Sequence, residues 1–119
     1  MIHTLNLQPQ PFAMIAEGLK TIELRLYDEK RSQIRVGDTL VFVHTDDSSR
    51  TLTATVTALH RFPDFAALYA ALPPERCGYL PEEISAASPE DMNVYYSAEK
   101  QALYGVVGIE IALCEEDSQ

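Results

Sequence analysis

Residues Thr51 to Leu59 alternate between polar and apolar side chains, and this pattern constrains the fold more than any other feature of the sequence. Threonine stands at positions 51, 53, 55 and 57, and the residues between them are Leu52, Ala54, Val56 and Ala58. Successive side chains of a strand point to opposite faces, so this segment is predicted to be a β-strand with one buried face. Such a strand must belong to a sheet that covers an apolar core.

Four other segments have the pattern of short strands, and three have the signals of helices. The predicted strands are residues 2–7, 21–27, 40–44 and 104–113, and the predicted helices are residues 9–18, 64–72 and 88–101. Proline near the start of each helix fits the first turn, and Ser88 adds a capping residue that is followed by acidic side chains. Residues 75–87 are expected to form a loop with one helical turn. The predicted order is β-α-β-β-β-α-α-β.

This order does not have the regular βαβ alternation of a doubly wound parallel sheet. It favours an α+β fold in which a small mixed sheet curls into a pseudo-barrel and the helices pack at its ends. The length of 119 residues fits one domain, so we expect a single domain over residues 1–119, with an acidic tail at residues 115–119.

Composition excludes several classes of protein. The two cysteines, Cys77 and Cys114, form no CxxC pair, and the three histidines lie far apart without ligand spacing, so we expect no metal, no cofactor and no disulfide framework. No stretch approaches the ~20 apolar residues of a membrane helix, and the first 20 residues lack the pattern of a signal peptide. We therefore expect a cytoplasmic protein without a membrane partner.

The formal net charge of −9 argues against broad wrapping of a nucleic-acid backbone. The basic residues are unevenly distributed, because residues 20–35 contain five of the nine lysines and arginines against three acidic residues. This local excess suits a small anionic or nucleotide-like ligand. The alternative interpretation is a set of solvated charges on a strand and a turn.

The densest group of chemically useful side chains lies between Gly18 and Arg25. Lys20, Glu23 and Arg25 place an amine, a carboxylate and a guanidinium within six residues. A regular strand would put Lys20 and Glu23 on opposite faces, so Lys20 must precede the strand if both serve one cleft. The alternative is an exposed ladder of charges that contributes at most ~1 kcal/mol.

This segment resembles the ASCH family (activating-signal-cointegrator homology domain), a relative of the PUA domains of RNA-modifying proteins. The resemblance rests on the pattern G-x-K-x-x-E-x-R, on the turn Val36-Gly37-Asp38, and on the late segments Tyr95-Tyr96-Ser97-Ala98-Glu99 and Tyr104-Gly105-Val106-Val107-Gly108. It covers nearly the whole chain. It implies a PUA-like pseudo-barrel with a cleft between the barrel and its helices, lined by the lysine, the glutamate and the arginine.

The resemblance also implies a function in recognising RNA or a small nucleotide-like or modified-nucleoside ligand. Two enzymatic activities belong to parts of the family, namely amide hydrolysis of acetylated cytidine and cleavage of RNA. For such a hydrolase we expect Lys20 and Glu23 to be catalytic. We expect the ligand-binding residues to be Arg25, Tyr96, Ser97 and Tyr104.

Glu23 departs from the amidohydrolase branch that the chain resembles, where a threonine stands three positions after the lysine. Glutamate cannot repeat the nucleophilic chemistry of a threonine hydroxyl, but it can act as a general base on water while Lys20 holds the oxyanion. In RNA cleavage Glu23, Arg25 and Lys20 would serve as base, phosphate ligand and acid. The leading interpretation is a binding protein for RNA or a nucleotide-like ligand, with a nucleoside amidohydrolase and a ribonuclease as alternatives.

Overall fold

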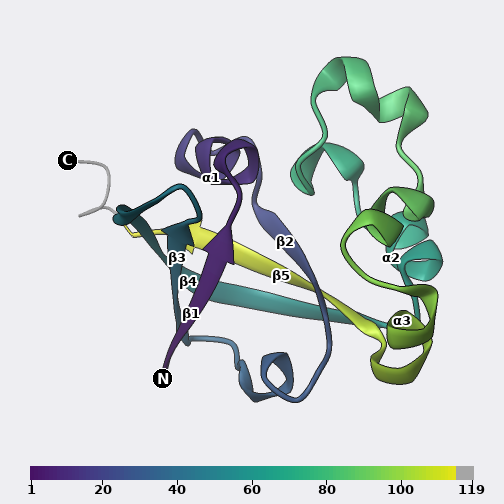
Figure 1. Cartoon of the computed structure of the whole chain (residues 1–119), viewed down its shortest axis with the longest axis horizontal. Helices are drawn as coiled ribbons and strands as arrows, with labels where there is room; N and C mark the ends of the chain where they lie inside the picture. Colours follow the sequence, from purple (N-terminus) through teal and green to yellow (C-terminus); the bar gives the residue numbers. More distant parts are fainter. Residues whose placement is uncertain (115–119) are drawn as a thin grey trace.

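Five strands form one curled, mixed sheet in the computed structural model, which describes residues 1–114 (Figure 1). The strands are β1 (Ile2–Leu7), β2 (Ile22–Leu26), β3 (Thr39–His44), β4 (Asp47–Phe62) and β5 (Val106–Leu113). They stand in the order β1-β3-β4-β5-β2, with β1 and β3 parallel and the other pairs antiparallel. The sheet is a half-barrel whose edge strands are β1 and β2. The acidic tail predicted at residues 115–119 lies outside the described residues.

The long strand β4 makes the sheet curl, because one end of it pairs with β3 and the other end pairs with β5. Residues 51–55 of β4 pair with β3, whereas residues 54–62 pair with β5. The register with β5 shifts between Val56 and Ala58, and such a bulge bends a strand and increases its twist. The strand predicted from the threonine alternation is therefore confirmed, and it extends beyond the predicted residues at both ends.

Helices connect the strands, and most of them lie between β4 and β5. The α-helices are α1 (Pro9–Ala16), α2 (Phe65–Ala71) and α3 (Ala98–Tyr104), and the 3-10 helices are η1 (Arg31–Gln33), η2 (Pro74–Arg76), η3 (Pro81–Ala86) and η4 (Pro89–Val94). Residues 63–105, which we call the helical excursion, lie beside the sheet (Figure 1). Within residues 1–114 no helix is both long and apolar enough to span a membrane.

Apolar side chains form two cores, one on each face of β5. The first core includes Val107 and Ile109 together with Phe12 and Ile15 from α1. The second core contains Val106 of β5, the apolar face of β2, and Phe65 and Leu68 of α2. This arrangement anchors the helical excursion to the sheet through α2, and the prediction of an α+β fold with a curled mixed sheet is confirmed.

The prediction of one helix over residues 88–101 is wrong. Ser88 caps a helix as expected, but that helix is η4 and it ends at Val94. Ser97 then caps a separate helix, α3, because its Oγ accepts a hydrogen bond from the Lys100 backbone nitrogen at 3.2 Å. Tyr104 ends α3 rather than beginning the last strand, which starts at Val106.

Candidate functional site

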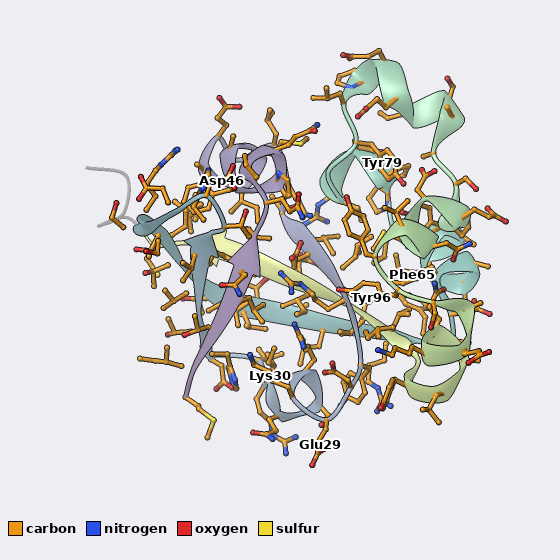
Figure 2. The ribbon with its side chains drawn as sticks, viewed as in Figure 1. Glu29, Lys30, Asp46, Phe65, Tyr79 and Tyr96 are labelled. Carbon is orange, nitrogen blue, oxygen red and sulfur yellow. The ribbon has the colours of Figure 1, made fainter. Side chains whose placement is uncertain are left out.

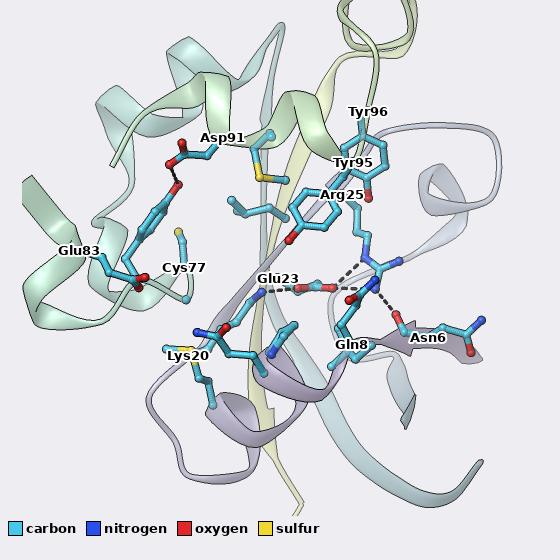
Figure 3. Close-up of a pocket in the computed structure, with 18 of the residues that line it drawn as sticks. Asn6, Gln8, Lys20, Glu23, Arg25, Cys77, Glu83, Asp91, Tyr95 and Tyr96 are labelled. Atoms are coloured by element: carbon cyan, nitrogen blue, oxygen red, sulfur yellow. Dashed lines mark hydrogen bonds and ion pairs between the residues drawn. The ribbon is translucent and has the colours of Figure 1, made fainter. Parts of the chain in front are cut away.

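A cleft of about 530 Å³ lies between the sheet and the helical excursion (Figure 3). One wall is formed by the end of β1, by α1 and by β2, and the other by α2, the segment 77–79 and the region from Asp91 to Tyr96. Small-molecule sites in proteins commonly have volumes of about 300–1,000 Å³. The cleft therefore has the size of a small-molecule site.

Lys20, Glu23 and Arg25 converge in this cleft and form two ion pairs (Figure 3). Lys20 Nζ lies 2.7 Å from Glu23 Oε1. Arg25 Nη2 and Nε lie 2.7 and 2.8 Å from the other carboxylate oxygen, Glu23 Oε2. We call this group the triad.

The local backbone explains how residues three positions apart reach one another. Lys20 precedes β2, in the turn after α1, where its backbone nitrogen donates to the Met14 carbonyl at 3.2 Å. Glu23 and Arg25 then alternate along β2, on the face opposite the apolar residues that enter the second core. Lys20 therefore lies before the strand, as convergence with Glu23 requires.

The triad is buried, so the alternative of an exposed charge ladder is excluded. The side chains of Lys20, Glu23 and Arg25 are 10%, 4% and 12% exposed. Burial by itself would raise the pKa of Glu23, but the charges of Lys20 and Arg25 lower that pKa below its ordinary value. Burial would likewise lower the pKa of Arg25, and Glu23 reverses this and raises it. Glu23 is therefore ionised at neutral pH beside two basic side chains.

Gly78 makes room for the aliphatic part of Lys20. Its φ is +107°, and a Cβ at this position would lie 3.1 Å from Lys20 Cδ. The neighbouring Cys77 is buried and lines the cleft, and burial raises the pKa of its thiol to about 11. The sequence does not indicate the role of these two residues, because they lie in a segment that is predicted to be a loop with one helical turn.

A chain of hydrogen bonds forms part of the opposite wall. Tyr79 donates its hydroxyl proton to Asp91 Oδ2 at 2.7 Å, so its oxygen accepts from the Tyr69 hydroxyl, also at 2.7 Å. Burial raises the pKa of both Tyr69 and Tyr79, which keeps the two phenols protonated at neutral pH. Tyr69 belongs to α2, Asp91 to η4, and Tyr79 to the loop between η2 and η3, and nothing in their sequence spacing indicates that they meet.

The remaining predicted ligand-binding residues occupy three different environments. Tyr96 lines the cleft and stacks on Phe65, with ring centroids 6.1 Å apart and an interplanar angle of 18°. Ser97 caps α3 and is not part of the cleft lining. Tyr104 lines a separate hollow. The structure thus brings together Lys20, Glu23, Arg25 and Tyr96, and places the other two predicted residues elsewhere.

The cleft has no donor set for a metal ion among the residues that the structure describes. No group of three or more histidine, cysteine, aspartate or glutamate side chains is arranged to hold one within residues 1–114. The two cysteines, Cys77 and Cys114, are free thiols.

Several solved structures are similar to this chain. The crystal structure of the hypothetical protein PH0355 is 31% identical with a TM-score of 0.79, and the match covers 96% of this chain and 100% of that chain. The solution NMR structure of protein PF0455 from Pyrococcus furiosus is 33% identical with a TM-score of 0.68, covering 97% of this chain and 99% of that one. A search among curated proteins found no match.

A crystal structure of an ASCH protein from Zymomonas mobilis shares the fold. It is 14% identical with a TM-score of 0.66, and the match covers 93% of this chain and 66% of that chain. The sequence model of the ASCH domain matches residues 5–115. Because this match spans nearly all of the chain and the curled half-barrel is the same PUA-like fold, the protein belongs to the ASCH domain family.

Proposed function

We propose that the cleft binds one nucleotide unit, either of RNA or of a small nucleotide-like ligand, with the triad at its polar centre. The observation that supports this proposal most directly is the burial of two basic side chains and one carboxylate in a cleft of nucleotide size. The triad carries more positive than negative groups, so it can accept a further anion. A phosphate group supplies that anion.

Arg25 has a donor to offer the ligand. Its Nη2 and Nε bind Glu23, and Nη2 also donates to the Asn6 carbonyl at 2.7 Å. Its Nη1 makes no hydrogen bond within residues 1–114, and a guanidinium nitrogen suits a phosphate oxygen. We therefore assign phosphate binding to Arg25, with Glu23 holding the guanidinium in place.

The rest of the cleft offers groups that suit a base and a sugar. Tyr95 is 63% exposed and lies beside Tyr96 at the cleft, so an aromatic face is available for stacking. Side chains such as Gln8 and Asp91 can hydrogen-bond to the edge of a base. The net charge of −9 disfavours a long RNA contact, so the ligand is small or a short single-stranded element.

A titration with the four ribonucleoside 5′-monophosphates tests this proposal. We expect saturable chemical-shift changes at cleft residues, and about tenfold weaker binding for Arg25→Gln, because a charge-assisted hydrogen bond contributes roughly 1.5–3 kcal/mol. Arg35→Gln is the matched control, since Arg35 is exposed and lies outside the cleft. Equal weakening by both variants, or no binding at low salt, would contradict the proposal.

Hydrolysis of a modified nucleoside is a second candidate, favoured by the 2.7 Å contact between Lys20 and Glu23 inside the cleft. The lowered pKa of Glu23 makes its carboxylate a weak base, and both of its oxygens are already paired. Catalysis through Glu23 therefore requires the substrate to displace one of the two cations. This requirement favours binding over hydrolysis as the main function.

Liquid chromatography of acetylated cytidine incubated with the protein separates the two candidates. Turnover that is lost in Lys20→Ala but kept in Lys100→Ala, an exposed lysine on α3, would establish the amidohydrolase. No turnover at high protein concentration would leave the cleft as a binding site. The same incubations with single-stranded RNA test the ribonuclease alternative.

A further inference from the structure

A second hollow, of about 430 Å³, lies at the opposite end of β2 from the triad lysine. It is lined by Asp28, Glu29, Lys30, Gln33 and Tyr104. Four of these residues belong to the loop that follows β2, which includes the two labelled residues Glu29 and Lys30 in Figure 2. The fifth is the last residue of α3. Two distant parts of the chain therefore meet to form this hollow.

The backbone holds the two sides of the hollow together. The Tyr27 nitrogen, at the end of β2, donates to the Gly105 carbonyl at 3.0 Å. Gly105 has a φ of +72°, and a Cβ there would lie 3.1 Å from the Phe62 carbonyl oxygen, so a glycine is required at this turn. The turn fixes Tyr104 beside the β2 loop and leaves its side chain 42% exposed as an available aromatic surface.

A polar path connects the cleft to this hollow along β2. Arg25 belongs to the triad, and the negative charge of Asp28 helps to raise its pKa. Asp28 in turn pairs with Arg31 at 3.1 Å, and both charges act on the hydroxyl of Tyr96 in the cleft. Arg31 Nε is buried without a hydrogen-bond partner within the described residues. Arg25 lines the cleft and Asp28 lines the second hollow, so only three positions of the chain separate the two at the end of β2.

The charges of the second hollow favour a base over an isolated anion. Asp28 and Glu29 are acidic, and Lys30 lines the same hollow while Arg31 pairs with Asp28, so positive and negative groups balance. A free phosphate would meet two carboxylates there. A nucleobase would instead meet the ring of Tyr104 together with hydrogen-bonding groups at its edge.

We propose that the second hollow is a subsite for another nucleoside of the strand whose first unit occupies the cleft. The ligand is then a short single-stranded oligonucleotide rather than a free nucleotide. Tyr104 stacks on the second base, Gln33 and Glu29 contact its edge, and Lys30 neutralises a neighbouring phosphate. This inference rests on the proposed function of the cleft and names the class of ligand.

Binding of the four ribonucleoside monophosphates is compared with binding of the four single-stranded RNA homotetranucleotides. We expect at least one tetranucleotide to bind about tenfold more tightly than its monophosphate, because stacking of one base on an aromatic side chain contributes a factor of roughly five or more. Tyr104→Leu and Lys30→Gln should each reduce the ratio of the two affinities. Lys100→Gln, an exposed lysine of α3, is the control and should keep that ratio.

The outcomes separate this inference from the proposed function. If monophosphates bind in an Arg25-dependent way but tetranucleotides bind no more tightly, the subsite is refuted and the function of the cleft stands. If the tetranucleotide gain persists in both Tyr104→Leu and Lys30→Gln, the additional contact lies elsewhere and the inference is wrong. If neither the monophosphates nor the tetranucleotides bind, both the proposed function of the cleft and the proposed subsite are wrong. Thermal unfolding of each variant confirms that it is folded.

Discussion

Replacement of Glu23 by glutamine removes the negative charge between Lys20 and Arg25 while it keeps the shape of the side chain. The Glu23 side chain is 4% exposed and its two partners are 10% and 12% exposed, so water cannot take over the role of the carboxylate. The two cations would then lie near each other in the cleft without a counter-charge. We therefore expect Glu23→Gln to be strongly destabilising.

The magnitude follows from the burial of the triad. Removing one partner of a buried ion pair costs about 3–5 kcal/mol, since the remaining charge loses its compensation. Glutamine still offers one oxygen to one of the two cations, so we expect a loss of about 3 kcal/mol. For a domain of this size each kilocalorie lowers the melting temperature by roughly 4 °C, which predicts a decrease of roughly 12 °C.

Denaturant titration followed by circular dichroism measures this change. Glu110→Gln is the matched control, because Glu110 pairs with His60 and Arg76 at the surface and its side chain is 26% exposed. The control should lose about 1 kcal/mol or less. Adding Lys20→Met to Glu23→Gln should recover part of the loss, since one uncompensated cation disappears. A loss for Glu23→Gln no larger than that of the control would show that the buried triad does not stabilise the fold.

The pH dependence of stability gives a second measurement of the same interaction. The pKa of Glu23 is lower in the folded protein than in the unfolded chain. Its contribution is therefore fully present above the unfolded pKa of about 4.3 and is lost as the pH falls through the folded value. We expect the stability of the wild type to fall more steeply than that of Glu23→Gln below about pH 4.3. Parallel curves would show that the carboxylate is not stabilised by the triad.

Three further predictions concern other parts of the molecule. Gly78→Ala should destabilise the protein more than Gly37→Ala in thermal unfolding, because both positions have positive φ but only the first Cβ would press on Lys20; equal losses would mean that the contact has no cost. Cys77 should react with iodoacetamide very slowly at pH 8, since its pKa is raised to about 11 and its side chain is buried, and rapid labelling seen by peptide mass mapping would contradict this. Hydrogen bonds from His3 and the Arg35 backbone lower the pKa of Asp38 to about 2, so stability should fall between about pH 4 and pH 2 in the wild type and less in Asp38→Asn; an unchanged slope in urea titrations would rule this out.

Most elements of the fold were predictable because their signals lie in adjacent residues. The threonine alternation correctly predicted the centre of β4, and the proline and capping signals correctly predicted the starts of α1, α2 and η4. The prediction of one helix over residues 88–101 is wrong because the segment contains two capping serines, and each of them begins a helix of its own. Ser97 binds the Lys100 nitrogen and begins a new helix, an outcome that helical spacing alone does not indicate.

The polar centre of the cleft could be predicted from the sequence, because the triad residues lie within six positions of one another. The side chains of Lys20 and Glu23 can reach each other only if Lys20 precedes the strand. In the structure Lys20 does precede β2, and the two side chains form an ion pair. The family resemblance added Tyr96, which lines the same cleft. It also added Ser97 and Tyr104, which lie outside the cleft lining.

The strands, their polar and apolar faces and the composition of the triad can be predicted from the chain alone, because these properties depend on side-chain periodicity and on neighbours in the sequence. The packing of distant segments, by contrast, makes Tyr69, Tyr79 and Asp91 part of the opposite wall and places Gly78 beside Lys20. The first contacts join distant parts of the helical excursion, and the Gly78 contact brings the excursion against the turn before β2. They depend on α2 burying its apolar face against β2 and β5. The depth of the cleft, and with it the desolvation that gives the triad its electrostatic strength, follows from that packing.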